Sequence, residues 1–281
     1  MTVPAIGRRR VLLGLAALAA GLVRGAAPGQ ATAPVAERGL RLLDDGAIDA
    51  MRTRVARPPA PDSVRVLFVG NSFTYEHDVP GRVAALAAGE GVALDVELLA
   101  EGGARLGATL ARPGMRALLA EGHWDAIVLQ DHSTAALDSA FRAEGATAVA
   151  YAAAVAPAPV VLFSPWAREA GHALYTRGLG LRPGVPRPAD PAAMTAATAA
   201  HVDRLAAGNG TVHVAPVARA WAAAIAGGRR LHGPDRYHAA PAGAALTAEV
   251  LWQALAPLLA RALPAGPGRR EDRGAASPPG D

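Results

Sequence analysis

The stretch that decides the fold is Val64–Thr74, which reads VRVLFVGNSFT. It opens with a short apolar run rich in valine and ends in Gly-Asn-Ser. A run of this length, bounded by turn residues, is typical of a buried β-strand. Glycine permits a tight turn, and a serine two residues beyond the strand can present its hydroxyl at the rim of the sheet. The same residues also fit a plain helix start, in which Ser72 or Thr74 acts as the cap.

Four further runs of this kind follow along the chain. They predict strands at Val92–Leu99, Trp124–Gln130, Pro159–Phe163 and Thr211–Val217. Longer alanine-rich segments between them predict helices at Pro80–Ala88, Leu106–Glu121, Ala140–Ala156, Pro191–Ala207, Ala218–Ala226 and Pro241–Ala262, several with proline in the first turn. Regular alternation predicts an α/β fold, a three-layer open parallel sheet of about five strands with helices on both faces. Ligands of such sheets bind at the carboxyl ends of the strands.

Composition narrows the class of protein. The chain has 281 residues, 51% of them hydrophobic, and no cysteine, which predicts one globular domain that does not rely on disulfides. Its positive charge comes from arginines near the amino terminus, because the remaining 24 arginines balance 24 acidic residues. A neutral body lacks the basic surface that nucleic acid needs, so no nucleic-acid partner is expected.

The amino terminus has the layout of a signal peptide over residues 1–31. Arg8–Arg10 precede the apolar run Val11–Val23, and small residues continue to Ala31. The paired arginines resemble a twin-arginine export signal, with general secretion as the alternative. Because the run is too short to span a bilayer, we expect membrane contact only during export and a periplasmic or extracellular mature protein.

The rest of the chain divides into three parts. Residues 32–63 are interpreted as a lead-in or linker whose weakly amphipathic patch can pack on the domain. Residues 64–263 are interpreted as the domain, and residues 264–281 as a disordered tail of Pro, Gly and charged residues. Within the domain, Ser164–Asp190 is predicted to be a long loop without secondary structure. It contains Trp166, Arg168, His172, Tyr175 and Arg177, and its place after a strand makes it a candidate substrate wall.

Three more turns at the expected functional edge carry chemistry. Gly102 and Gly103 follow the second strand, where a backbone N–H can approach a ligand closely. Gln130 ends the third strand and offers an amide donor. Asp235 and His238 lie three apart in a turn, so that the carboxylate can hold the imidazole. A hydroxyl, a close-approach glycine, an amide and an Asp–His pair together indicate acyl transfer.

The order Gly-Asn-Ser, Gly, Gln-Asp and Asp-x-x-His resembles the SGNH hydrolases, also called GDSL-like esterases and lipases. The four blocks lie within Val64–Leu251, about two thirds of the chain. The resemblance implies a flavodoxin-like fold and a triad of Ser72, His238 and Asp235. It also implies an oxyanion hole built from the backbone N–H of Ser72, the N–H of Gly102 or Gly103, and the Gln130 side chain. It implies no cofactor and no metal.

Two departures from the family pattern stand out. Gln130 occupies the place where the family usually has Asn, and Ala239 and Ala240 follow the histidine where Pro and Ser are frequent. The blocks look like those of a branch whose members mostly lack an assigned substrate. The resemblance therefore implies a serine esterase but hardly indicates its substrate. The export signal and the polar loop with its arginines and tryptophan predict an exported enzyme that acts on a small-molecule or carbohydrate ester, and they favour an O-acetylated carbohydrate over a lipid.

Three alternatives remain open at this point. Metal-assisted hydrolysis is suggested by the adjacent pairs His77-Asp78 and Asp131-His132 together with Asp235 and His238. A non-catalytic binder of acylated glycans would keep the same geometry without turnover. A phosphate-binding loop at Gly70–Thr74 would leave Asp235 and His238 unexplained. The other histidines are expected to be structural: His123, His172, His201, His213 and His232. His77 is expected in a solvated loop, with a pocket-lining position as the alternative.

Overall fold

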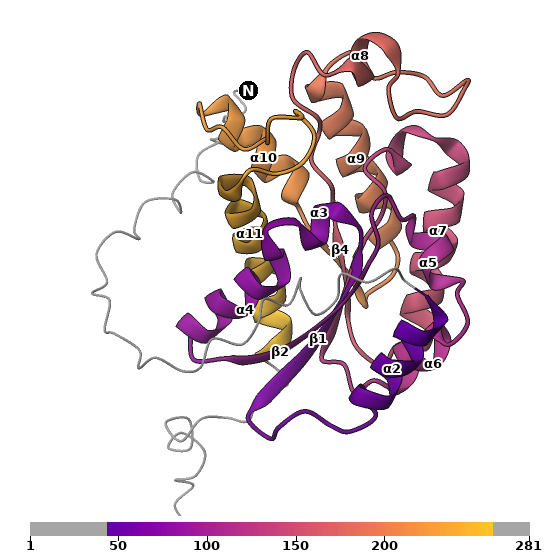
Figure 1. The fold of residues 1–281 in the computed structure, drawn as a ribbon, viewed down its shortest axis with the longest axis vertical. Coiled ribbons are helices and arrows are strands. Elements are labelled where there is room, and N and C mark those ends of the chain that lie inside the picture. The colour runs from indigo at the N-terminus through magenta and orange to yellow at the C-terminus, as the bar shows by residue number, and fades with distance from the viewer. Residues whose placement is uncertain (1–43, 261–281) are drawn as a thin grey trace, which may run out of the picture. The chain divides into compact units, whose positions relative to one another are not determined.

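The computed structural model describes residues 44–260, so the expected signal peptide, the first part of the lead-in and the expected tail lie outside the described residues. In the described part five strands form one sheet: β1 (Ser63–Gly70), β2 (Ala93–Ala100), β3 (Ala126–Gln130), β4 (Val160–Phe163) and β5 (Val212–Ala215). Their order is β2-β1-β3-β4-β5, and every neighbouring pair is parallel (Figure 1). The predicted α/β fold with a parallel sheet is confirmed, and each predicted strand agrees with an observed one to within two residues at either end.

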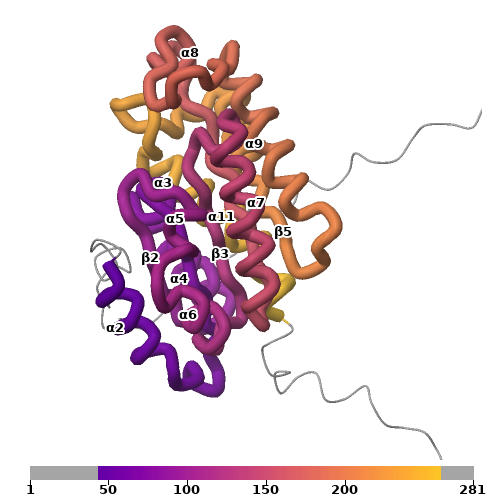
Figure 2. Tube along the Cα trace, turned by 90° about the vertical axis from the view of Figure 1, so that its right-hand side faces the viewer, coloured from indigo at the N-terminus to yellow at the C-terminus, as the bar shows by residue number. Residues whose placement is uncertain are grey.

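Helices cover both faces of this sheet (Figures 1 and 2). One face carries α4 (Val79–Gly89), α10 (Val217–Ala226) and α11 (Pro241–Leu259). The other carries α2 (Asp45–Val55), α5 (Leu106–Leu110), α6 (Met115–Glu121), α7 (Ser139–Val155) and α9 (Pro191–Ala206). The short elements α3 (Ser72–Tyr75), η1 (Glu76–Asp78), η2 (Ala135–Leu137) and α8 (Ala173–Arg177) lie in connections. Proline stands in the first turn of α4, α9 and α11, as expected.

The sheet is apolar on both faces because both are covered. In β1, Val66 and Phe68 join the core beneath α4 and α11, whereas Leu67 and Val69 join the core beneath the opposite helices. Successive side chains of a strand point to opposite faces, so a strand buried on both sides becomes a continuous apolar run. This is why VRVLFV marks a central strand and not an edge strand.

Two expectations about local structure are wrong, and the lead-in also has structure of its own. The single helix predicted at Leu106–Glu121 is two helices, because Pro113 and Gly114 interrupt it and Gly114 has the left-handed φ of 79°. The loop Ser164–Asp190 is not without secondary structure, since it contains α8. The lead-in contains α2, which is capped by the Asp44 side chain and buries three apolar residues in the core, Ile48, Met51 and Val55.

Helix α11 runs through the core. Among the described residues it is the one helix whose length and hydropathy would suffice to cross a membrane, but more than half of it is buried inside the domain. It has the character of a core helix.

The order of the strands creates a switch point between β1 and β3. From β1 the chain passes to β2 on one side and then returns to β3 on the other. Gly70 is in register with Ala100, and Val69 with Leu129, so the turns after the three strands meet at one edge of the sheet. In open α/β sheets this is where ligands bind.

Candidate active site

The turn after β1 presents Ser72 at this edge. Asn71 has extended backbone angles and its side-chain oxygen accepts the N–H of Phe73, so it caps α3 and Ser72 becomes the first helical residue. The Ser72 side chain is largely enclosed, with 7% of the residue exposed. The Asn71 amide donates to the carbonyl of Ala104, 2.9 Å away, which ties the serine turn to the loop that follows β2.

Gln130, at the end of β3, supports the same turn from the other side. Its Oε1 accepts the Asn71 N–H and the Thr74 hydroxyl, each at 2.9 Å, and its Nε2 donates to the carbonyl of Asp131. The residue is 1% exposed. In this geometry the Gln130 amide is bonded within the protein and supports the serine turn, because β3 lies directly beside β1. An oxyanion role for Gln130 stays a prediction.

The histidine lies in a turn between α10 and α11. This turn is closed by an isolated bridge between His232 and Ala239 and by the Gly233 N–H, which donates to the carbonyl of His238. Asp235 shapes it, since its Oδ1 accepts the N–H groups of Tyr237 and His238 at 3.0 Å each. Asp and His three apart in sequence thus face one another across an Asx turn.

The predicted triad residues come together in space. Asp235 Oδ2 lies 2.6 Å from His238 Nδ1, and His238 Nε2 lies 3.0 Å from Ser72 Oγ. An ionised carboxylate can only accept, so Nδ1 of the neutral ring carries the proton and Nε2 is left to accept the serine hydroxyl. Partial burial would raise the pKa of Asp235, but hydrogen bonds from Tyr237 and His238 hold that pKa below its ordinary value. The acid of the triad is therefore ionised at neutral pH.

Aromatic side chains pack around the base. The Phe73 ring lies 5.8 Å from the His238 ring and 4.3 Å from the Trp166 ring, and the Tyr237 ring lies 4.2 Å from His238. The Arg168 guanidinium stands 4.1 Å above Tyr237. This packing fixes the imidazole between the serine turn and the loop after β4.

That packing also corrects the expectation for the loop Ser164–Asp190. Trp166 is buried and stacks on Trp221 at 4.0 Å, Arg168 is buried, and the His172 ring caps α8 by accepting the Leu174 N–H. These three side chains hold the wall of the site from behind and do not form its exposed surface.

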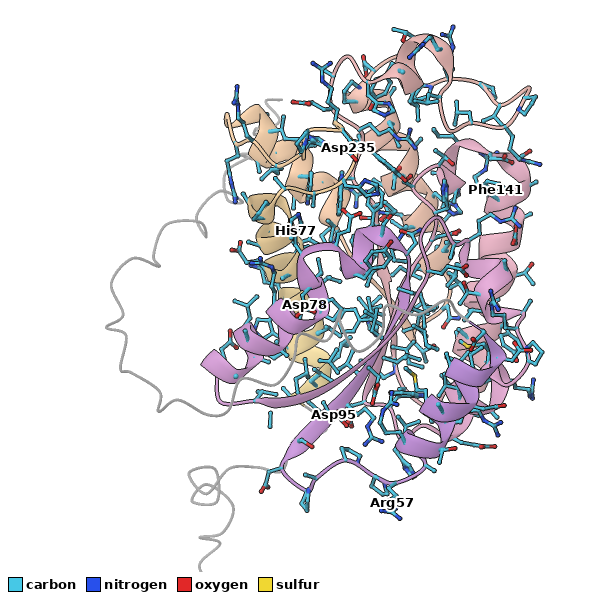
Figure 3. All side chains as sticks on the ribbon, in the orientation of Figure 1. Arg57, His77, Asp78, Asp95, Phe141 and Asp235 are labelled. Carbon is cyan, nitrogen blue, oxygen red and sulfur yellow. The ribbon has the colours of Figure 1, made fainter. Side chains whose placement is uncertain are left out.

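Gly102 and Gly103 border a groove of about 620 Å³. Gly103 has the left-handed φ of 71°, and a β-carbon at that position would meet no atom within 4 Å, so its backbone faces open space. The groove is lined by Glu101–Arg105, Gly180–Arg182, Ala108, His132 and Phe141. Arg105 and Arg182 both place their guanidinium 4.7 Å from the Phe141 ring. Figure 3 shows Phe141 apart from Asp235 and His77. An oxyanion role for Gly102 or Gly103 stays a prediction.

The residues proposed for the alternatives are engaged elsewhere. Within residues 44–260 no three His, Cys, Asp or Glu side chains gather as a metal site would require. The Asp131 Oδ1 accepts the N–H groups of Leu106 and His132, and burial raises the pKa of Asp131 to about 6. In the Gly70–Thr74 turn the N–H groups of Asn71, Phe73 and Thr74 bond within the protein, which leaves no cradle for a phosphate.

Two neighbours of the triad come from the segment after Ser72: Glu76, which sequence reasoning missed, and His77, for which a solvated loop was expected and a pocket-lining position was the alternative. Glu76 Oε1 lies 3.6 Å from His238 Nε2. The exposed ring of His77 bonds the carbonyl of Ala239 through Nε2 at 3.0 Å. The one sequence signal was their position four and five residues after Ser72, which places them one helical turn further along the chain.

Comparisons with known proteins show that the fold is a known one. No family model matches the chain, and a search of curated proteins finds no match. Several solved structures are similar to this chain in fold, among them the following two. A DUF4886 family protein from Bacteroides uniformis is 19% identical, with a TM-score of 0.57, over 73% of this chain and 88% of its own. A lipase/acylhydrolase from Enterococcus faecalis is 15% identical, with a TM-score of 0.51, over 68% of this chain and 95% of its own.

At these identities the likeness concerns the fold alone. What is confirmed is the predicted fold, an open parallel sheet with helices on both faces, which this chain shares with both structures.

Proposed function

We propose that this chain is a serine esterase of the SGNH type, which hydrolyses a carboxylic ester through an acyl-enzyme. One observation carries the proposal: the hydrogen-bonded line from Asp235 through His238 to Ser72, with atoms 2.6 Å and 3.0 Å apart. A nucleophile within reach of a base, itself oriented by a third group, is the arrangement that acyl transfer requires.

In the first step Ser72 Oγ bonds to the ester carbonyl carbon while its proton passes to His238 Nε2. The carbonyl oxygen takes up the negative charge, and we assign its stabilisation to the backbone N–H groups of Ser72 and of Gly102 or Gly103. Collapse of the tetrahedral intermediate breaks the carbon–oxygen bond to the alcohol. His238 gives its proton to that alcohol, and the acyl group remains on Ser72.

The second step runs the same movements with water. His238 Nε2 takes a proton from a water molecule as the water oxygen bonds to the acyl carbon. Collapse of the second intermediate releases the carboxylic acid and returns the proton to Ser72 Oγ. Asp235 keeps the imidazole in one tautomer throughout and stabilises its protonated form.

For the substrate we propose an O-acetylated carbohydrate. The groove beside Gly102 and Gly103 is open, and it is lined by glycine backbone, two arginines, a histidine and a glutamate together with a few apolar side chains. Such a surface suits a hydroxylated molecule better than an acyl chain, which would need a deep apolar pocket. Arg8–Arg10 and the apolar run that follows them support export to a compartment where such glycans occur.

The test uses the purified protein with nitrophenyl acetate and a fluorophosphonate probe. Ser72→Ala and His238→Ala are each expected to lower kcat by about 10⁴-fold or more, because either change removes a member of a unit that acts together. Ser139→Ala is the matched control, since this serine is exposed at the start of α7. The probe is expected to label Ser72, as located by mass spectrometry.

Turnover retained by Ser72→Ala would overturn the mechanism. Ester binding without hydrolysis, in a protein whose Ser72 resists the probe, would favour a non-catalytic binder of acylated glycans. Acetylated sugars should be hydrolysed faster than octanoyl esters, and the reverse preference would overturn the substrate class alone.

A further inference from the structure

A second carboxylate reaches the base from the nucleophile's side. Glu76 begins η1, four residues after Ser72, and its Oε1 lies 3.6 Å from His238 Nε2. The same nitrogen is 3.0 Å from Ser72 Oγ, and the other ring nitrogen is 2.6 Å from Asp235. The imidazole thus stands between two carboxylates, one near each nitrogen.

The backbone that carries Glu76 is strained. His77 and Asp78, the next two residues, have φ of 56° and 51°, in the left-handed region that residues other than glycine rarely adopt. Both are held in place: the Asp78 side chain caps α4, Arg82 Nε donates to the carbonyl of His77 at 2.7 Å, and the His77 ring bonds the carbonyl of Ala239. Strained backbone conformations that the surrounding structure holds in place cluster at functional sites.

This anchoring joins the two halves of the site. Ala239 directly follows the base, so the His77 contact ties the segment after the nucleophile to the loop that carries His238 (Figure 3 shows His77 and Asp235 on the same side of the sheet edge). A strained turn fixed at both ends holds the Glu76 carboxylate at a set place relative to the imidazole.

Glu76 is not committed to another cation. Although the chain has 28 arginines, the ion pair of Glu76 among the described residues is with His238. Partial burial raises the pKa of Glu76, while the nearby His238 works against that rise. A partly buried carboxylate that forms no ion pair with an arginine of residues 44–260 is suited to stabilise a positive charge that appears only during the reaction.

We propose that Glu76 is a positioning residue that stabilises the protonated imidazole of His238 during acyl transfer. The inference rests on the proposed esterase function. When Ser72 Oγ gives its proton to Nε2, the resulting imidazolium lies between Asp235 and Glu76. When the proton passes to the leaving alcohol, Nε2 returns to its neutral state and Glu76 is unchanged.

The proposal predicts a pH dependence with a defined sign. A carboxylate near Nε2 favours the protonated ring, so removing its charge lets His238 lose its proton at lower pH. The titratable or polar groups that contact the ring are Asp235, Tyr237, Ser72 and Glu76. Behind them, His77 bonds the carbonyl of Ala239, and Arg168 and His172 pack on the Tyr237 ring. Because the others are unchanged in a Glu76 variant, a shift is attributable to Glu76.

The test compares Glu76→Gln and Glu76→Asp in the full chain. Glu76→Gln is expected to lower the plateau of kcat by about 3- to 10-fold and to move the acidic limb of kcat/KM down by about half a pH unit. Glu76→Asp, which keeps the charge, is expected to retain much of the wild-type kcat and most of the wild-type position of the acidic limb. Glu169→Gln is the matched control: it removes a carboxylate that pairs with Arg236 beside the triad turn, and should change neither.

A second readout does not depend on turnover. The His238 ring signals in NMR should titrate at lower pH in Glu76→Gln than in wild type, and this holds even in a protein without esterase activity. Identical titration curves and identical acidic limbs would overturn the role of Glu76. If the wild-type protein hydrolyses no ester but the His238 titration still differs between wild type and Glu76→Gln, the proposed function is overturned and the Glu76–His238 coupling stands. If Glu76→Gln does not fold, Glu76→Ala removes the same charge. An acidic limb and a His238 titration displaced to lower pH in Glu76→Ala support the proposal, and wild-type curves overturn it.

Discussion

For a single residue such as Gln130, the contacts of the side chain do not follow from its position in a sequence block. Its place at the end of β3, before Asp131, matches the block that usually supplies an oxyanion donor. In the fold its Oε1 instead accepts two donors from the serine turn, the Asn71 N–H and the Thr74 hydroxyl. The longer arm of glutamine, compared with asparagine, reaches across to the neighbouring strand. Which way such an arm turns depends on the strand beside it.

We therefore expect Gln130→Ala to affect stability before it affects chemistry. The change leaves a buried N–H and a buried hydroxyl without acceptors, which costs about 2–4 kcal/mol of the free energy of unfolding. Urea unfolding measures this, and Gln253→Ala on the exposed side of α11 is the control. A loss of about 100-fold in kcat with unchanged stability would instead indicate an oxyanion donor.

At the scale of elements, glycines decide where helices can pack. Gly243 lies in the first turn of α11, and a β-carbon there would stand 2.6 Å from the Trp221 ring and would also meet the carbonyl of Leu231. Gly89, at the exposed end of α4, has no atom within 4 Å of such a β-carbon. Helix α11 is the last element of the described domain, and the Asp235–His238 turn directly precedes it. The packing of α11 against α10 therefore sets the position of that turn.

The two glycines predict opposite outcomes for the same substitution. Gly243→Ala is expected to destabilise the protein by about 1–3 kcal/mol, since the neighbouring carbonyl belongs to backbone and cannot turn away. Gly89→Ala is expected to be neutral or to stabilise by up to about 1 kcal/mol, because alanine is the better helix former. Thermal unfolding of both variants measures the difference, and equal melting temperatures would contradict the packing argument.

Helices were also where prediction from pattern was least accurate. The apolar spacing of Leu106–Glu121 suits one helix, but Pro113 and Gly114 end α5 and begin α6. Helix α8 has five residues and was missed, because so short a segment carries little periodicity. Strands were predicted more accurately, since their buried apolar runs are continuous.

At the scale of the whole molecule, the domain is larger than its motif blocks. Helix α2 precedes the first block, yet Ile48 is completely buried against the sheet face that also receives α6 and α7. Arg54 of α2 forms a two-bond ion pair with Glu97 of β2, and the buried Arg65 donates to the carbonyl of Val55. The segment interpreted as a lead-in is thus part of the core.

Ile48→Ala is accordingly expected to cost about 2–5 kcal/mol, as for any large core side chain cut to alanine. Thr53→Ala, on the exposed side of the same helix, is the control and should change stability by less than about 0.5 kcal/mol. Both proteins should unfold in one transition. A transition in which α2 is lost first, with the sheet intact, would mean that the helix is only an appendage.

The amino-acid sequence was enough to predict the layers, the parallel sheet and the serine, aspartate and histidine of the proposed triad, because alternating apolar runs and turn residues act over a few positions. Asp235 and His238 could be paired from their spacing for the same reason. Tertiary structure alone decided the meeting of Ser72 and His238 across 166 positions, the support role of Gln130 and the approach of Glu76 to the base. Those contacts depend on which strands are neighbours and on where the packing of α11 holds the turn before it. Both are set only when the complete core packs.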